Sequence, residues 1–98
     1  MLMAQVSSEL DRQRFAAVGQ ALADPKRLCV LESLQVGELS VSDLSSRVGC
    51  QIPNMSQHLA VLRRAGLVTT RREGNTVYYS LADQRVIEAY RLIQSLAR

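Results

Sequence analysis

Polar side chains gather at the start of an otherwise apolar segment. Residues 54–68 read NMSQHLAVLRRAGLV, so that small polar and amide groups come first and apolar residues follow at helical spacing. Hydroxyl, amide and guanidinium groups hydrogen-bond to DNA bases and phosphates. An ordinary amphipathic surface helix shows the same division into faces. The residues predicted to contact DNA from this segment are Asn54, Ser56, Gln57, His58, Arg63 and Arg64.

The excess of positive charge lies in the same part of the chain. The 98 residues carry a net charge of +3, and residues 51–80 hold four arginines against one acid, Glu73, while the remainder is balanced. A local basic excess is typical of a phosphate-binding face, although a chance imbalance on a solvated surface looks alike. We predict that Arg71, Arg72 and Asn75 contact the DNA backbone or minor groove.

Two cysteines, Cys29 and Cys50, are the other candidates for chemistry. Two are too few for a disulfide framework, and a cytosolic chain would keep them reduced. They could form one redox pair, lie inertly in the core, or help to bind a metal. A disulfide would require their Cα atoms to lie within ~7 Å of each other.

Composition excludes several classes of protein. With 47% hydrophobic and 21% charged residues, the sequence predicts one folded, soluble domain spanning residues 1–98. Residues 1–13 show no signal peptide, and no apolar run is long enough for a membrane span, so we expect a cytoplasmic protein without a membrane partner. There is no nucleophile–base pair, glycine-rich phosphate loop or spaced carboxylate pair, so neither an enzyme nor a cofactor is expected.

Five helical segments are predicted from their capping residues and apolar spacing. Ser8, Asp24 with Pro25, and Ser40 begin the first three helices, at 8–22, 24–37 and 40–48, and Pro53 begins a fourth that runs to residue 64. The last helix spans 83–96. The expected apolar faces are Leu10, Phe15, Val18 and Leu22; Leu28, Leu31 and Leu34; Val41, Leu44 and Val48; Met55, Leu59 and Leu62; and Val86, Ala89, Tyr90, Ile93 and Leu96. The last of these faces has no partner left in the sequence.

Between the fourth and last helices, the apolar residues no longer recur at helical spacing. Val, Thr and Tyr residues flank Glu73, Gly74 and Asn75, which predicts a β-hairpin with a Gly-Asn turn at about 67–81. Helices 40–48 and 53–64, joined by a tight turn with Gly49, have the order of a helix-turn-helix, in which the second helix enters the DNA major groove. The predicted fold is therefore mainly α with a small β-hairpin wing. A winged-helix module for protein interaction, without DNA binding, is the alternative.

Three strings resemble the ArsR/SmtB family of bacterial transcriptional repressors. They are DPKRLCVLESL, GELSVSDLSSRVG and SQHLAVLRRAGLVTTRREGNTVYYSL, and the likeness covers about residues 12–96. The resemblance implies a homodimer that represses its operon by binding a palindromic double-stranded DNA operator and releases it when an inducer binds. It also implies a dimer interface between the first helix (8–22) and the last (83–96), formed by Phe15, Val18, Leu22, Val86, Tyr90 and Ile93.

The resemblance does not identify the inducer. At the two positions of the helix 40–48 where family members carry metal-binding cysteines, this sequence has Ser40 and Ser42. At a metal-binding histidine position of the last helix, it has Arg85. Hydroxyl groups are poor ligands for soft metals, so no metal site is expected. The family's thiol switch pairs cysteines on the second and last helices, and this last helix has none. A redox switch through Cys29 and Cys50 remains as the alternative.

Overall fold

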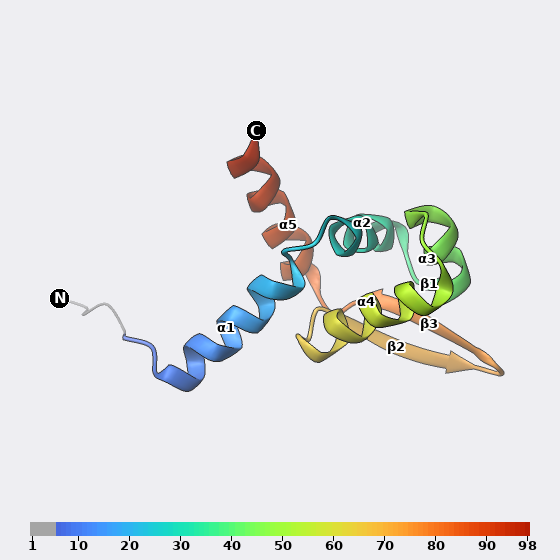
Figure 1. The fold of residues 1–98 in the computed structure, drawn as a ribbon, viewed down its shortest axis with the longest axis horizontal. Helices are drawn as coiled ribbons and strands as arrows, with labels where there is room; N and C mark the ends of the chain where they lie inside the picture. The colour runs from blue at the N-terminus through green and yellow to red at the C-terminus, as the bar shows by residue number, and fades with distance from the viewer. Residues whose placement is uncertain (1–5) are drawn as a thin grey trace.

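The computed structural model describes residues 6–98, which form five α-helices and a small sheet (Figure 1). The helices are α1 (Glu9–Ala21), α2 (Pro25–Ser33), α3 (Val41–Val48), α4 (Ile52–Arg64) and α5 (Gln84–Ala97), with a 3₁₀ turn η1 (Leu34–Val36) after α2. The strands are β1 (Leu39–Ser40), β2 (Val68–Glu73) and β3 (Thr76–Leu81). The prediction about a signal peptide concerned residues 1–13, of which 1–5 lie outside the described residues.

The predicted capping residues begin their helices. The Oγ of Ser8 accepts a hydrogen bond from the backbone N–H of Asp11 at 3.0 Å, and a carboxylate oxygen of Asp11 accepts one from the Ser8 N–H. The side chain of Asp24 accepts from the N–H groups of Lys26 and Arg27, and the Oγ of Ser40 accepts from that of Asp43. These bonds satisfy N–H groups that have no partner inside the helix. One prediction was wrong by a residue, because α4 begins at Ile52 rather than at proline, which occupies the second position of the helix.

The hairpin is confirmed, and a third strand joins it. Glu73 pairs with Thr76, so Gly74 and Asn75 form the turn, and Gly74 has a φ of +61° that only glycine adopts without strain. The short strand β1, which was not predicted, pairs antiparallel with β3, and the sheet has the order β1-β3-β2. Two residues are too few to show a strand period.

The core is formed mainly by the helices. Met55, Leu59 and Leu62 of α4 are fully buried, as predicted. On α2, Val30 is buried while Leu28 is only partly so, which corrects the predicted face. The cause is that α2 packs against α3, α4 and α5, not against a single neighbour. The buried cluster comprises Ala21, Val30, Leu31, Leu34, Leu44, Met55, Leu59, Leu62, Val68 and Val86.

The expectation that α5 has no partner in the chain was wrong. Val86 and Tyr90 are buried within one chain, because α5 packs against α2. The hydroxyl of Tyr90 donates a 2.7 Å hydrogen bond to a carboxylate oxygen of Glu32 on α2. This bond to an anion, together with burial, raises the pKa of Tyr90 above its ordinary value. Other apolar residues of α5 stay uncovered, since Leu92 is 66% and Leu96 is 85% exposed.

The molecule is elongated, with principal extents of 53 × 31 × 21 Å. Figure 1 shows α1 and α5 projecting from one end and α2, α3, α4 and the sheet together at the other. We call these parts the terminal pair (α1 and α5) and the reading half (α2–β3). Within residues 6–98, no helix combines the length and the apolar character that a bilayer crossing requires.

Candidate nucleic-acid interface

A glycine turn sets the angle between α3 and α4. Gly49 lies in the left-handed region with a φ of 78°, and its N–H donates to the carbonyl of Ser45 at 2.9 Å. The N–H of Cys50 donates to the same carbonyl at 3.2 Å. These bonds end α3 and allow α4 to start three residues after Gly49. Since α3 and α4 then pack together, the pair has the helix-turn-helix arrangement.

Three of the four polar residues predicted at the start of α4 face outward. Asn54, Ser56 and Gln57 are exposed, whereas Met55 between them is fully buried. Ile52, at the first position of α4, is 51% exposed and was not predicted as a site residue. An exposed apolar side chain at this position has the character required for contact with a thymine methyl group. The only feature of the sequence that could have indicated a role for Ile52 was its position directly before Pro53.

The fourth polar residue, His58, faces the protein. It is partly buried on the flank of α4 toward α2, and its Nδ1 lies 3.2 Å from Nη1 of Arg27. A guanidinium group has no acceptor, so Nδ1 of the imidazole must accept this hydrogen bond. Only Nε2 is then left for another partner. The sequence pattern alone could not show which flank of the helix His58 occupies.

A hollow of about 430 Å³ lies between α4 and the sheet. Two guanidinium groups line it together with hydroxyl groups, a combination suited to an anion such as phosphate. Tyr79 comes from β3 and was not among the predicted site residues. The lining residues are Ser56, Ala60, Arg63, Arg64 and Tyr79.

The two arginines of the wing lie on opposite faces of the hairpin. Successive side chains of a strand point to opposite sides, so Arg72 shares a face with Val68, which is buried in the core. Arg72 pairs with Val77, two residues before Tyr79 at the hollow, so its face is the one toward α4. Arg71 lies on the other face.

Arg71 is held by carboxylates of its own chain. Its Nη2 and Nε donate to the two carboxylate oxygens of Glu38 at 2.5 and 3.2 Å, and Nη1 donates to Glu73 at 2.7 Å. The guanidinium carbon also lies 5.0 Å from the centroid of the Tyr78 ring. The hydrogen bond from Arg71 lowers the pKa of Glu38, and Glu38 in turn raises the pKa of Arg71. The positive charge of Arg71 is therefore largely offset inside the molecule.

The other predicted arginines keep their charge available. In the described part of the chain, Arg63, Arg64 and Arg72 are exposed and form no ion pair. Asn75 is exposed in the wing turn. The positive surface of the reading half thus includes the end of α4 and one face of the wing.

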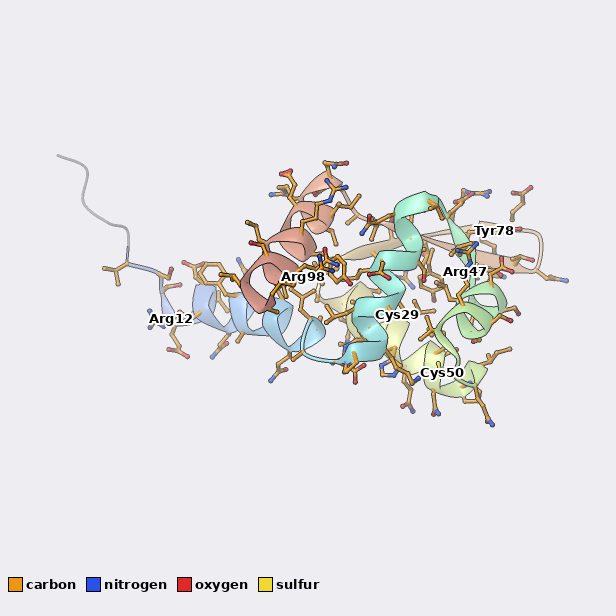
Figure 2. The ribbon with its side chains drawn as sticks, turned by 90° about the horizontal axis from the view of Figure 1, so that it is seen from above. Arg12, Cys29, Arg47, Cys50, Tyr78 and Arg98 are labelled. Atoms are coloured by element: carbon orange, nitrogen blue, oxygen red, sulfur yellow. The ribbon has the colours of Figure 1, made fainter. Side chains whose placement is uncertain are left out.

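The cysteines lie in different surroundings. Both are free and partly buried: Cys29 is on α2, and Cys50 is in the turn before α4, where it packs against the core (Figure 2). Residues 6–98 contain no group of three or more His, Cys, Asp and Glu side chains placed to hold a metal ion.

Comparison with known proteins gives one consistent result. The family model described as "Bacterial regulatory protein, arsR family" matches residues 24–70. Over 69 residues the chain is 49% identical to the HTH-type transcriptional regulator KmtR of Mycobacterium tuberculosis, covering 70% of this chain and 53% of KmtR. Over 77 residues it is 46% identical to the transcriptional activator HlyU of Vibrio cholerae, covering 79% of this chain and 71% of HlyU.

A solved structure is similar over almost the whole chain. It is the homodimeric winged helix-turn-helix DNA-binding domain Mb0332 (fragment 1–100) of Mycobacterium bovis, determined by NMR and described as a possible ArsR-family regulator. The two are 35% identical with a TM-score of 0.84, and the match covers 97% of this chain and 90% of that one. The present fold is thus a winged helix-turn-helix. The chain spans about half the length of KmtR.

Proposed function

Because this chain belongs to the arsR family of bacterial regulatory proteins, which are transcriptional regulators and not enzymes, we propose that it is a homodimeric repressor of transcription. The observation that carries the proposal is one continuous surface of the reading half. On it, the exposed polar residues of α4 adjoin the hollow with its two arginines and the α4-facing side of the wing. Such a surface offers donors for base edges and charge for phosphates.

The proposed contacts follow from the position of each side chain. Asn54, Ser56 and Gln57 point away from the core at the start of α4, so we assign them to base edges in the major groove. Arg63 and Arg64 at the hollow bind the phosphate backbone. In the wing, Arg72 and Asn75 reach the backbone or the minor groove. Arg71 and His58 contribute less directly, since each is bonded within the chain.

Exposed apolar residues support the homodimer. Leu10 and Phe15 of α1 and Leu92 and Leu96 of α5 are each more than half exposed, which leaves apolar surface of the terminal pair open to water. A second copy would cover it, with α1 and α5 as the dimerisation helices, residues 40–64 as the reading head and 67–81 as the wing. Val18, Leu22 and Ile93, which are partly buried, complete this interface, whereas Val86 and Tyr90 are already covered by their own chain. A two-fold dimer reads a palindromic operator.

The experiment that tests this function is selection of duplexes from a randomised DNA pool by the full chain. We expect enrichment of an inverted repeat with half-sites about 10 base pairs apart, the spacing of one helical turn. The affinity for that duplex should fall steeply with salt, because arginines release counterions from phosphates. A reporter gene behind the selected operator should be silenced by the protein. Activation of the reporter would contradict repression. This outcome is worth testing because the similar protein HlyU is described as an activator.

The alternative is a winged-helix module that binds a protein partner. It predicts no enriched duplex and no salt-dependent DNA binding even at low ionic strength. The placement of three unpaired arginines, Arg63, Arg64 and Arg72, on α4 and the α4-facing side of the wing argues against it, because a protein-binding module does not require that placement.

Release from DNA by an inducer is part of the proposal, and the two thiols are the candidates for a redox trigger. Both are free and only partly buried, and Cys50 lies two residues before the start of α4. A gel shift of reduced and mildly oxidised protein, with Cys29→Ser and Cys50→Ser, tests this. Oxidation should release the DNA, and either substitution should prevent release. Equal binding by both forms would show that the cysteines are structural and that another ligand is sensed.

A further inference from the structure

One partly buried arginine connects three helices. Arg27 lies on α2, and its side chain is only 16% exposed. Its Nε and Nη2 donate to the main-chain carbonyls of Ala21 and Gln20 at 2.9 and 2.8 Å, and its Nη1 donates to Nδ1 of His58 at 3.2 Å. A single rigid guanidinium group therefore contacts both the end of α1 and the side of α4.

Arg27 is the main polar connection of α1 to the rest of the protein. The last carbonyls of a helix have no partner within it and form its negative end, so a guanidinium group is well matched to them. Only Ala21 of α1 is buried. In the part of the chain that the structure describes, every other side-chain hydrogen bond of α1 stays within residues 7–12.

Asp24 holds the arginine in place. Its carboxylate accepts the backbone N–H groups of Lys26 and Arg27 at 2.8 and 3.1 Å, and its second oxygen lies 4.0 Å from Nη1 of Arg27. Partial burial opposes ionisation, but the two N–H donors outweigh it and lower the pKa of Asp24. The carboxylate is therefore charged at neutral pH and orients the guanidinium group from the start of α2.

We propose that Arg27 is a positioning residue that couples α1 to α4 through His58. The inference rests on the proposed function, in which α1 belongs to the dimer interface and α4 reads DNA. The donors of a guanidinium group have fixed directions, so they reach the α1 carbonyls and the imidazole together in one relative placement of the two helices. A displacement of α1 at the dimer interface is thus transmitted to α4 by the side chain of Arg27. The proposed function places Arg27 in neither the dimer interface nor the DNA-contacting surface.

The imidazole itself reports on this connection. His58 is the only histidine of the chain, so its ring nitrogen signals in NMR belong to one residue. In the free wild-type protein at neutral pH, we expect Nδ1 to be unprotonated and Nε2 to carry the proton. Arg27→Lys and Arg27→Met should both give a mixture of tautomers, whereas Lys26→Met, at an exposed neighbouring position, should leave the signals unchanged. An unchanged tautomer in the Arg27 variants would overturn the proposal.

Transmission from α1 is tested by separating the dimer. Phe15 is 60% exposed on α1, and Phe15→Asp should move the His58 signals of the wild-type chain but not those of the Arg27→Lys chain. Equal shifts in both backgrounds would show that α1 reaches α4 by another route. Arg27→Lys keeps a positive charge, and its free energy of unfolding is measured alongside, so a loss of folding is recognised as such.

DNA binding completes the test. Arg27→Lys should weaken binding to the selected duplex by about tenfold, a usual size for coupling between two sites. The double variant with His58→Ala should lose no more than the worse single variant, because both act through one bond. Additive losses would contradict the coupling. If the wild type binds no duplex, the proposed function fails, and the NMR measurement still decides whether Arg27 links α1 to His58.

Discussion

The reading half and the terminal pair differ in how completely they bury their apolar residues. In the reading half, Leu44, Met55, Leu59 and Leu62 are fully buried. In the terminal pair, Phe15 is 60% and Leu96 is 85% exposed. Since burial of apolar surface is the main stabilising term in folding, one half is complete within a single chain and the other is not.

This difference separates two tasks. The exposed positions of the reading half are mostly polar or basic, as a surface for DNA requires, and the exposed positions of the terminal pair include large apolar side chains. Val36 on η1 is an exception, because it is apolar and 78% exposed in the reading half. It therefore serves as a control for the effect of exposed apolar surface alone.

The largest effect is expected from Phe15→Asp. A charge in the proposed interface should separate the dimer and lower affinity for the operator by about 100-fold or more, because two linked half-sites bind far more tightly than one. Sedimentation and fluorescence anisotropy measure the two quantities. Val36→Asp should leave both as in the wild type. A dimeric Phe15→Asp protein would show that the terminal pair is not the interface.

A smaller effect, confined to sequence preference, is expected from Gln57→Ala. Loss of an amide that reads a base should weaken the selected duplex by about 1–3 kcal/mol while random duplexes bind as before. The matched control is Gln84→Ala, since Gln84 is an exposed glutamine on α5. Competition binding with both duplexes measures the ratio. An equal loss on both would remove Gln57 from base recognition.

The two wing arginines should differ in their salt dependence. Arg72→Ala removes an unpaired charge, so the slope of log affinity against log salt should become shallower by about 1 for every duplex. Arg71→Ala removes a charge already offset by Glu38 and Glu73, and the slope should stay near that of the wild type. Anisotropy titrations at several salt concentrations measure both slopes. Equal changes would contradict the assignment of Arg72 to the DNA-facing side.

The smallest effect concerns acid stability of the wing. The hydrogen bond from Arg71 lowers the pKa of Glu38 from its ordinary 4.5. A lowered carboxyl pKa contributes stability that is fully present above the ordinary value and is lost as the pH falls through the lowered one. The gap in free energy of unfolding between wild type and Glu38→Gln should be small and constant at neutral pH, and should begin to narrow once the pH falls below 4.5.

Comparing the wild type with Glu38→Gln isolates the contribution of Glu38 to acid stability. The pKa values of Asp24 and Asp83 are lowered as well, but both proteins contain these two residues. Denaturant unfolding between pH 3 and 7 measures the gap. A gap that stays constant down to pH 3 would show that the Glu38–Arg71 pair does not hold the wing.

The features that the sequence predicted correctly are local. Ser8, Asp24 and Ser40 cap helices through bonds to residues two or three positions later, and Gly74 supplies the backbone angle of its own turn. Such preferences act within one turn of chain and can be recognised from neighbouring letters. The helices and the hairpin were therefore predicted to within a few residues.

The features that it missed depend on distant residues. Arg27 and His58 are 31 positions apart, and Glu38 and Arg71 are 33 apart. Nothing in either neighbourhood indicates the partner, so His58 and Arg71 were predicted as DNA contacts. The burial of Tyr90 likewise depends on α2, more than fifty residues earlier in the chain. Composition identified the charged surface, but not which of its arginines are already paired.

Ser40 belongs to two structures at once. It pairs with Tyr78 as the last residue of β1, and its hydroxyl accepts the Asp43 N–H that starts α3. The wing is consequently not an independent appendage. Its strand β3 is hydrogen-bonded to β1, and β1 continues directly into α3, the first helix of the helix-turn-helix. A chimera that exchanges wings between relatives should therefore carry residues 38–40 together with 67–81, because a graft of the hairpin alone would break the shared strand and loosen the helix that supports the graft.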